Sequence, residues 1–298
     1  MLKNRKSGIL LHISSLPSKY GIGDLGEQAY HFIDKLKQMG QVYWQILPTN
    51  EPNGSNSPYD TSSAFAQNPM FISLESLLSD SLLENRDFNG ITDQDSSKID
   101  FDHLKKWKSP LLTKAAKKFQ KKHKHKQNND FVAFCKMNKH WLDSYAAYKV
   151  LKDINNNLPW FEWDDDLKCF NEEAIGRALQ HEFEEIEIIK IVQYFFNKQW
   201  HSLKNYANEK NISLIGDLPI YISHDSVDVW SNQQLFKLDD DGNMMVKSGC
   251  PPDYFMEEGL GMGGAMGNMF GNMMGNTMQQ PPQQPHQQPP PMTPNLFH

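Results

Sequence analysis

The sequence predicts an α/β domain that carries a large helical insertion and is followed by a tail of different composition. Two apolar runs, residues 8–13 and 42–47, flank a stretch with helical spacing at residues 24–40, which is the strand–helix–strand order of a parallel pair. Residues 74–206 then show almost entirely helical periodicity, and the apolar run at residues 211–217 returns to a strand. This order indicates the beginning of an α/β domain interrupted by about 130 helical residues.

Turn-forming residues mark the ends of the predicted elements. Asp24 is the expected N-cap of the first helix, with an acidic residue three positions later, and Gly40 is expected to end that helix. Pro48 stops the second strand, because proline has no backbone N–H to donate. Asp241 and Gly242 have the composition of a tight hairpin turn.

Periodicity and composition divide the chain into four segments. Residues 1–73 hold the first strands and a helix, residues 74–208 the mainly helical insertion, and residues 209–255 a strand, a hairpin and a loop. Residues 256–298 contain no Lys or Arg and are rich first in Met and Gly, then in Gln and Pro. Such a composition buries too little apolar surface to offset the entropy of ordering, so this tail is predicted to be disordered.

The overall composition argues against several classes of function. The net charge of −6 gives no electrostatic case for nucleic acid binding, and no apolar run approaches the length of a membrane span. The three cysteines are far apart and odd in number, which argues against a disulfide framework or a zinc site and favours a reducing compartment. We therefore expect a cytoplasmic protein with no metal, no other cofactor and no membrane partner.

One local charge run lies at residues 104–126, where ten residues are lysine. The lysines recur around an apolar stripe with helical spacing, which favours a solvated helix face over a site for a polyanion. The stripe consists of Leu104, Trp107, Leu111, Leu112, Ala115 and Phe119.

Three segments combine loop residues, aromatic residues and acidic or amide side chains. They are residues 56–59, residues 216–222 and residues 249–255. Sugars are bound by carboxylates and amides that hydrogen-bond their hydroxyl groups, and by aromatic faces that stack on the ring. Each segment by itself is equally typical of a turn, a helix cap or a stiff loop, so only their combination predicts a sugar site.

The motifs of the chain, taken in order, resemble one family closely. They are residues 5–17 (RKSGILLHISSLP), 20–26 (YGIGDLG), 43–48 (YWQILP), 56–59 (NSPY), 63–69 (SAFAQNP), 141–145 (WLDSY), 159–163 (PWFEW), 199–200 (QW), 215–221 (IGDLPIY), 225–230 (DSVDVW), 235–236 (LF) and 251–255 (PPDYF). This order is similar to the N-terminal part of amylomaltase, the 4-α-glucanotransferase or disproportionating enzyme of glycoside hydrolase family 77. Two positions depart from the family: residues 50–53 stand where it usually has a Thr-Gly turn, and Gln67 stands where it usually has glycine.

The resemblance implies a fold and a reaction. The fold would be a partial TIM-type (β/α) barrel with a large helical insertion, which acts on malto-oligosaccharides or α-1,4-glucan. In the family's retaining double displacement, an Asp attacks the anomeric carbon while a Glu protonates the leaving oxygen, and the two carboxyl groups lie roughly 5–5.5 Å apart. A hydroxyl group of a second glucan then accepts the glycosyl unit.

The resemblance also implies roles for individual residues. Ser57 and Tyr59 would line the donor side, and Asp217 would hydrogen-bond near the unit that is cleaved. The lid loop over the acceptor would be formed by Asp253, Tyr254 and Phe255.

The reacting carboxylates of the family have no counterpart in this sequence. The family's nucleophile lies in an Arg-x-Asp-His segment and its acid/base in a Glu-Asp-Leu-Gly segment, both downstream of the Pro-Pro-Asp-Tyr-Phe loop. This chain has neither Asp nor Arg after Phe255. A (β/α)8 barrel needs about 250 residues before insertions, and the part of this chain outside the insertion is expected to supply only three or four strands.

Three hypotheses follow for the function. The chain is a 4-α-glucanotransferase by descent; or it is a catalytically inactive module that binds α-glucan through Tyr59, Asp217 and the loop around Tyr254; or it is a truncated or fused product whose Met- and Gln-rich tail mediates weak association. A further expectation is self-association through the open edges of an incomplete barrel. A turnover assay separates the first hypothesis from the second, and deletion of the tail tests the third.

We predict that the purified chain does not disproportionate maltotriose, because carboxylates are the reacting groups of the mechanism and both family segments are absent from the sequence. The measurement is glucose release from maltotriose. A rate above the buffer blank that co-purifies with the protein through a second purification would contradict the prediction.

Overall fold

The structure analysed is a computed structural model of the chain. It describes residues 5–91, 98–124, 127–219 and 221–246, together with the backbone of residues 249–250 and 260–261.

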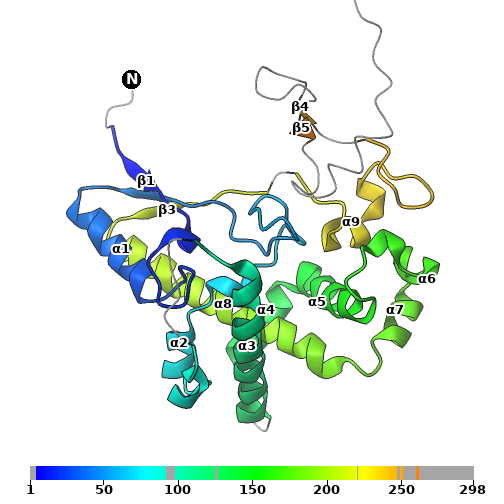
Figure 1. Cartoon of the computed structure of the whole chain (residues 1–298), viewed down its shortest axis with the longest axis horizontal. Coiled ribbons are helices and arrows are strands. Elements are labelled where there is room, and N and C mark those ends of the chain that lie inside the picture. The colour runs from blue at the N-terminus through cyan, green and yellow to red at the C-terminus, as the bar shows by residue number, and fades with distance from the viewer. Residues whose placement is uncertain are drawn as a thin grey trace, which may run out of the picture.

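A parallel sheet forms the part of the fold that carries the predicted barrel strands (Figure 1). Its strands lie in the order β1 (Gly8–Leu10), β2 (Tyr43–Gln45) and β3 (Ser213–Ile215). Gly8 pairs with Tyr43, which in turn pairs with Ser213. The strands predicted at residues 8–13, 42–47 and 211–217 are therefore confirmed, although each is shorter than its apolar run, and the described sheet is open rather than closed into a barrel.

The spacing between β1 and β2 depends on a glycine. A Cβ atom placed on Gly8 would lie 2.4 Å from the Cβ of Tyr43, closer than two carbon atoms approach. On the middle strand, Trp44 is only 1% exposed, and its indole N–H donates to the carbonyl of Leu11 over 2.8 Å. This hydrogen bond holds β2 against the segment that follows β1.

The first helix, α1 (Glu27–Gln38), connects β1 to β2 as predicted. It ends at Gly40, which has a φ of +68°, a left-handed conformation that glycine adopts without a steric penalty. Its N-terminus differs from the prediction: the N-cap is Gly26, and the carboxylate of Asp24 accepts a hydrogen bond from the N–H of Gly26 over 2.8 Å. The chain stays extended through Gly26, so Asp24 stabilises the turn before the helix instead of its first turn.

The insertion is helical, in line with its periodicity. Its helices are α2 (Leu74–Ser79), α3 (Phe101–His123), α4 (Asn129–Met137), α5 (Lys139–Ile154), α6 (Asp165–Lys168), α7 (Glu172–Ala178) and α8 (Phe183–Glu209). The remaining helical elements of the described chain are η1 (Ile13–Ser15), η2 (Pro69–Phe71), η3 (Asn85–Phe88), η4 (Trp160–Glu162), α9 (Val227–Ser231) and η5 (Gln233–Leu235).

The long helix α8 joins the two parts of the molecule. It contacts α1 beside the sheet and α3, α4 and α5 in the insertion (Figure 1). One hydrophobic core surrounds the sheet, α1, α3 and α8, and a second one, built on buried tryptophan and tyrosine side chains, lies between α5, η4 and α9. No helix in the described segments combines the length and the apolar character needed to cross a membrane.

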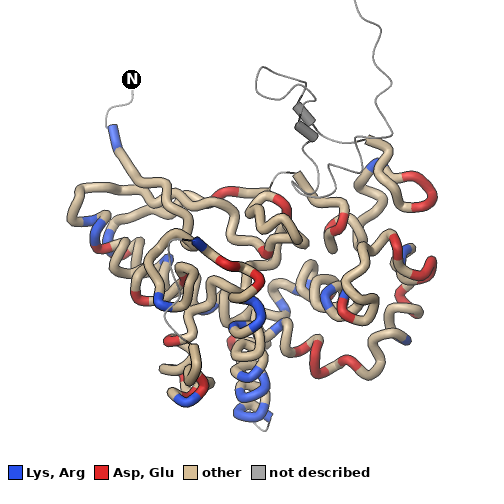
Figure 2. Tube along the Cα trace, in the orientation of Figure 1, with Lys and Arg blue, Asp and Glu red and all other residues tan. Residues whose placement is uncertain are grey.

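The lysine-rich run forms α3, and Figure 2 shows its basic residues along the helix. Leu104, Leu112 and Phe119 of the predicted stripe are buried, as expected. Lys108 is the exception to the solvated lysine face, since it is fully buried and donates to the carbonyl of Met70 over 2.7 Å. Burial lowers the pKa of Lys108 to about 8, because a charged ammonium group loses its hydration there.

The hairpin predicted at Asp241 and Gly242 is reduced to one antiparallel bridge between Leu238 and Met244. Gly242 has the expected positive φ of +80°. The carboxylate of Asp239 accepts hydrogen bonds from the backbone N–H groups of two residues inside the turn. Backbone hydrogen bonds also cross the loop, from the N–H of Asp239 to the carbonyl of Asn243 over 2.9 Å and from the N–H of Met245 to the carbonyl of Lys237 over 3.0 Å. The hairpin is therefore short, and both its backbone and the side chain of Asp239 close it.

Backbone pairing also occurs beyond Phe255. The short strands β4 (Gly249–Cys250) and β5 (Leu260–Gly261) pair antiparallel. Residues 260–261 belong to the segment that is predicted to be disordered, and they pair through backbone groups that every composition provides. The disorder of residues 256–298 stays a prediction. The rest of residues 256–298 lies outside the described part of the chain, and the division into four segments stays a prediction.

We predict self-association through the two outer strands. In the described chain β1 and β3 each have one neighbour, and Leu10 and Ile215 on them are 56% and 41% exposed. Unpaired strand edges with apolar side chains are templates for pairing with another copy. At micromolar concentration, sedimentation velocity should show oligomers that Leu10→Lys reduces, because a lysine on an edge strand opposes pairing.

A matched control is Met137→Lys, which changes an apolar side chain that is 72% exposed on α4 and should leave the association as it was. Deletion of residues 256–298 should also leave it. A monomer that unfolds in one cooperative transition would contradict this prediction.

Candidate functional site

Two residues predicted for the site meet at the carboxyl ends of neighbouring strands. The hydroxyl of Tyr59, in the loop after β2, donates to Oδ2 of Asp217, just after β3, over 2.7 Å. The two residues are 158 positions apart in the chain. Tyr59 is 44% exposed and Asp217 is also exposed, so both side chains are accessible to a ligand.

The backbone around each residue fixes its direction. Asn56 has a φ of +56°, which turns the chain sharply before Ser57, and the hydroxyl of Ser57 accepts from the N–H of Tyr59 over 3.3 Å. The other carboxylate oxygen of Asp217, Oδ1, accepts from the N–H of Leu218 over 2.8 Å. Ser57 thus shapes the turn that presents Tyr59, while one oxygen of Asp217 is held by its own backbone.

The electrostatics of the pair keep the phenol protonated. The hydrogen bond to Asp217 raises the pKa of Tyr59 above its ordinary value of 10.0, because the carboxylate favours the hydroxyl that donates to it. Tyr59 is therefore a hydrogen-bond donor across the neutral range, and Asp217 is the acceptor.

The predicted lid residues Asp253, Tyr254 and Phe255 lie outside the described residues. Their roles stay predictions. In the described chain, no group of three or more His, Cys, Asp or Glu side chains is arranged to hold a metal ion.

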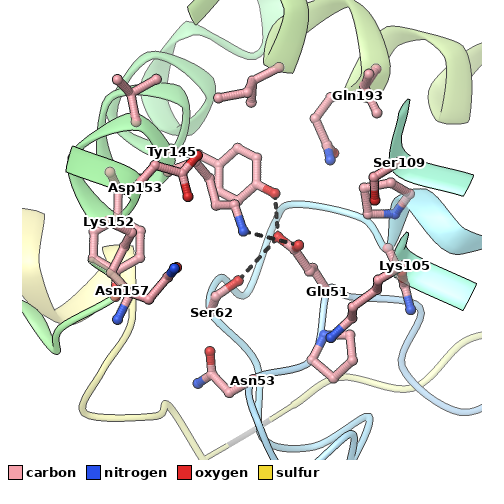
Figure 3. A pocket seen from close by; sticks show the side chains of 18 of the residues that line it. Glu51, Asn53, Ser62, Lys105, Ser109, Tyr145, Lys152, Asp153, Asn157 and Gln193 are labelled. Carbon is pink, nitrogen blue, oxygen red and sulfur yellow. Dashed lines mark hydrogen bonds and ion pairs between the residues drawn. The ribbon is translucent and has the colours of Figure 1, made fainter. Parts of the chain in front are cut away.

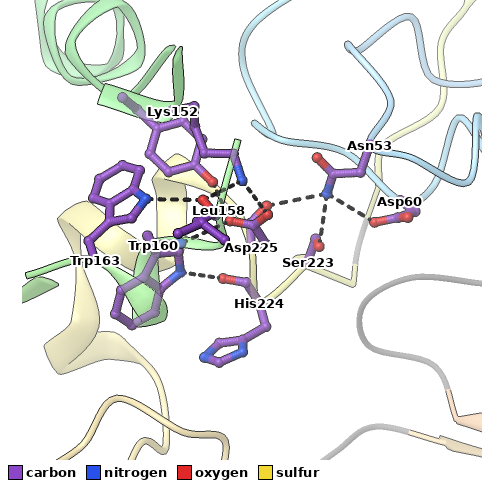
Figure 4. Close-up of polar contacts among 10 residues, drawn as sticks. Asn53, Asp60, Lys152, Leu158, Trp160, Trp163, Ser223, His224 and Asp225 are labelled. Carbon is purple, nitrogen blue, oxygen red and sulfur yellow. Dashed lines mark hydrogen bonds and ion pairs between the residues drawn. The ribbon is translucent and has the colours of Figure 1, made fainter. Parts of the chain in front are cut away.

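A hydrogen-bond network joins the loops that carry Tyr59 and Asp217 (Figure 4). The side-chain amide of Asn53 donates to Oδ1 of Asp60 over 3.1 Å, to the hydroxyl of Ser223 over 3.0 Å and to the carbonyl of Asp225 over 3.2 Å. Its two N–H groups are shared among these three acceptors. Asn53 therefore ties the loop after β2 to the loop after β3. It precedes Tyr59 in the first loop, and its partners Ser223 and Asp225 follow Asp217 in the second.

The carboxylate of Asp225 then ties these loops to the insertion (Figure 4). It accepts from the hydroxyl of Tyr148 over 2.6 Å, from Nζ of Lys152 over 2.7 Å and from the N–H of Trp160 over 3.3 Å. The side chains of Lys152 and Asp225 are 15% and 20% exposed, so the ion pair is largely removed from water. Burial, reinforced by Asp225, raises the pKa of Tyr148 far above its ordinary value, which keeps this donor protonated.

Comparison with known proteins identifies the family. Residues 11–261 match the family model described as 4-alpha-glucanotransferase. The chain belongs to the 4-α-glucanotransferase family. It is 41% identical over 260 residues to the 4-alpha-glucanotransferase of Streptococcus pneumoniae serotype 4, covering 87% of this chain and 51% of that protein. It is 42% identical over 251 residues to the enzyme of Clostridium butyricum, covering 84% and 51%.

Solved structures agree with this assignment. The amylomaltase from Streptococcus agalactiae in complex with acarbose superposes with a TM-score of 0.82 at 38% identity, over 86% of this chain and 52% of that one. The amylomaltase from Corynebacterium glutamicum, at 16% identity and a TM-score of 0.64 over 87% of this chain and 36% of that one, shows the same fold. The chain spans about half the length of the curated relatives it matches.

A partly buried ion pair lies at the loop after β2. Glu51 accepts from the hydroxyl of Tyr145 over 2.6 Å and from Nζ of Lys149 over 3.1 Å, at the wall of a cavity of about 1250 Å³ (Figure 3). Burial opposes the charge of Glu51, but Lys149 and Tyr145 prevail and hold the pKa of Glu51 below its ordinary value of 4.5.

Some of these residues gave no signal in the sequence. Glu51 and Asn53 belong to residues 50–53, a stretch whose sequence predicts no functional role for either residue. Lys152 is one of many lysines in the predicted helices. What identifies each of them is a partner across the fold that is distant in the chain: Ser223 for Asn53, Lys149 for Glu51 and Asp225 for Lys152. A buried charge that pairs over such a distance has no local pattern that could reveal it.

We predict that Glu51→Gln destabilises the protein at neutral pH, since Lys149 would keep a partly buried charge without a partner. The side chains of Glu51 and Lys149 are 17% and 34% exposed. The loss of unfolding free energy should therefore be about 1–3 kcal/mol, below the roughly 3–5 kcal/mol of a fully buried pair. Urea unfolding at pH 7 is the measurement.

The contribution of the Glu51–Lys149 pair to the free energy of unfolding depends on pH with a definite sign. Because the folded state lowers the pKa of Glu51, the pair stabilises the fold above the ordinary value of 4.5 and this contribution disappears as the pH falls through the folded pKa. The difference between Glu51→Gln and the parent should thus shrink in acid. Glu173→Gln, at a side chain that is 89% exposed, is the control with no expected effect. Equal stability of both variants at pH 7 would show that the pair contributes nothing.

Proposed function

We propose that this chain binds α-1,4-linked glucan at the Tyr59–Asp217 pair, as the N-terminal portion of a 4-α-glucanotransferase. The observation that carries the proposal is the 2.7 Å hydrogen bond between these exposed side chains at the carboxyl ends of β2 and β3. Barrel enzymes place their working residues at these strand ends. The acarbose complex of the related Streptococcus agalactiae amylomaltase supports a carbohydrate as the ligand class.

The parallel sheet is, in this proposal, the first part of a TIM-type barrel. Parallel strands joined through helices belong to sheets that are covered or closed, whereas β1 and β3 here have exposed outer edges. The order β1-β2-β3 follows the order along the chain, as it does in a barrel built strand by strand. The insertion between β2 and β3 would then form one wall above the barrel.

The pair supplies two kinds of contact with a sugar. The carboxylate of Asp217 has lone pairs left to accept from ring hydroxyl groups, because Tyr59 and the N–H of Leu218 use only part of its capacity. The exposed ring of Tyr59 offers an aromatic face to the apolar side of a glucosyl unit. Together they bind and orient one unit, while the chemical step of the family needs an attacking Asp and a protonating Glu from segments that this sequence does not contain.

The binding should be weak, on the order of millimolar, because a ligand in an open cleft loses little of its contact with water. We predict that Tyr59→Phe weakens the affinity for maltotriose about two- to tenfold through the lost hydroxyl, and that Tyr59→Ala weakens it further through the lost ring. Isothermal titration calorimetry and amylose-affinity electrophoresis measure the effect.

Tyr206→Phe is a matched control, because the hydroxyl of Tyr206 also donates to an aspartate, Asp34 at 2.9 Å, but between α8 and α1. It should leave the affinity unchanged. A Tyr59→Ala variant that binds amylose as well as the parent protein does would contradict the assignment of the glucan site to Tyr59.

A further inference from the structure

The short turn that presents Tyr59 is closed on itself. Residues 53–60 begin and end side by side, because the backbone N–H of Asn53 donates to the carbonyl of Asp60 over 2.8 Å. The buried carboxylate of Asp60 also accepts from the amide of Asn53 over 3.1 Å and from the hydroxyl of Ser55 over 2.8 Å. Tyr59 therefore stands next to an anchored residue on a closed turn.

The same amide reaches the segment that carries Asp217 (Figure 4). Asn53 donates to the hydroxyl of Ser223, a buried side chain that follows Asp217 closely in the chain. Tyr59 and Asp217 are thus connected in two ways. One connection is their direct hydrogen bond of 2.7 Å. The other runs through Asp60, Asn53 and Ser223, which side-chain hydrogen bonds join, so the amide of Asn53 limits how far the pair can separate.

The donors of Asn53 are engaged inside the protein. Its two amide N–H groups serve three acceptors: a carboxylate oxygen, a hydroxyl and a backbone carbonyl. Asn53 lines the cavity of about 1250 Å³ that Figure 3 shows, and neither Tyr59 nor Asp217 is among the described residues of its wall. Because its donors are engaged and it faces a different cavity from the pair, Asn53 acts on a glucan through the residues that it holds.

Other hydrogen bonds keep the two loops together without Asn53. The N–H of Val227 donates to the carbonyl of Ser62 over 2.9 Å. The N–H of Ala64 donates to Oδ2 of Asp228 over 2.8 Å. Both bonds join the later part of the loop after β2 to α9. Loss of the Asn53 amide should therefore release the closed turn while the loops stay attached to each other.

We propose that Asn53 is a positioning residue of the glucan site, which sets the place of Tyr59 relative to Asp217 without touching the ligand. The inference rests on the proposed glucan binding at this pair. Hydrogen bonds weaken steeply outside donor–acceptor distances of about 2.5–3.2 Å. A small displacement of the phenol from the carboxylate thus lowers the affinity for a sugar although both groups are still present.

The first measurement needs no glucan. In the full chain with labelled tyrosines, the ¹³C resonance of the Cζ atom of Tyr59 is the one that Tyr59→Phe removes. Asp217→Ala gives its position when the hydrogen bond is missing. In Asn53→Ala this resonance should move at neutral pH toward its position in Asp217→Ala, because the released turn no longer holds the phenol against the carboxylate. A resonance that stays at its position in the parent protein would overturn the proposal.

The second measurement is the affinity for maltotriose, by isothermal titration calorimetry. Asn53→Ala should weaken binding about two- to tenfold, the effect of one neutral hydrogen bond, although it removes no contact with the ligand. Adding Tyr59→Phe to Asn53→Ala should change the affinity by less than about twofold, because the hydroxyl is already displaced. If the effects of the two substitutions multiply instead, Asn53 does not act through Tyr59 and the proposal fails.

Asn50→Ala is the matched control. The buried amide of Asn50 also donates twice within the loop after β2, to the carbonyls of Ser63 and Ala66, both over 3.2 Å. This variant should keep the phenol resonance and the maltotriose affinity of the parent protein even if its unfolding temperature falls. An effect equal to that of Asn53→Ala would show that any lost amide in this loop disturbs the site, and it would overturn the role of Asn53.

Ser223→Ala is a second variant of the same connection, because it removes the acceptor of Asn53 in the other loop. It should move the phenol resonance and the affinity in the same direction as Asn53→Ala. Thermal unfolding checks that both variants fold, and Ser223→Ala decides the question if Asn53→Ala does not.

The outcomes separate this inference from the proposed function. Binding that falls with Tyr59→Ala but not with Asn53→Ala would overturn only the positioning role. Binding that falls with Asn53→Ala but not with Tyr59→Ala would overturn the assignment of the site to Tyr59 and, with it, positioning through Tyr59. A parent protein that binds no maltotriose would overturn both.

Discussion

The hydrogen bonds that converge on Asp225 are the constraint on which the candidate site depends. Tyr59 and Asp217 lie in loops that the whole helical insertion separates along the chain, and exposed loops alone do not hold a geometry. Asn53 joins these loops to each other, and Asp225 joins them to α5 through Tyr148 and Lys152. Because these donors and acceptors are partners in a largely buried network, breaking one bond leaves another group unsatisfied, and the network keeps the loops together.

Two polar side chains in the loop after β2, those of Glu51 and Gln67, each line a cavity. Glu51 stands on the wall of the large cavity, and Gln67 lines a smaller pocket of about 290 Å³ that Asp217 also lines. Each is held by specific partners, Glu51 by Lys149 and Tyr145 and Gln67 by Thr49, so neither is a loosely placed surface residue.

Sequence patterns identified the elements whose signal is local. The apolar runs and the helical spacing located β1, α1, β2 and β3, because side-chain periodicity directly reflects which face is buried. Periodicity gave a wrong prediction for Lys108, because a lysine in a lysine-rich helix is expected to be solvated. Its burial depends on the carbonyl of Met70, a partner that the helix sequence does not contain. Pattern-based prediction also failed at Asp24, where the chain stays extended for two residues more than the capping pattern indicates.

The sequence by itself determined the family and the strand–helix order, and it predicted the two residues of the proposed site, Tyr59 and Asp217, because motifs and periodicity are properties of neighbouring residues. Only the tertiary structure decided that these two side chains share a hydrogen bond, that Asn53 and Asp225 hold their loops, and that a pocket of about 290 Å³ lies next to Asp217. The reason is physical: these features are spaces between elements or pairings between residues 73 to 172 positions apart, and no short-range pattern encodes the direction in which a distant segment folds back.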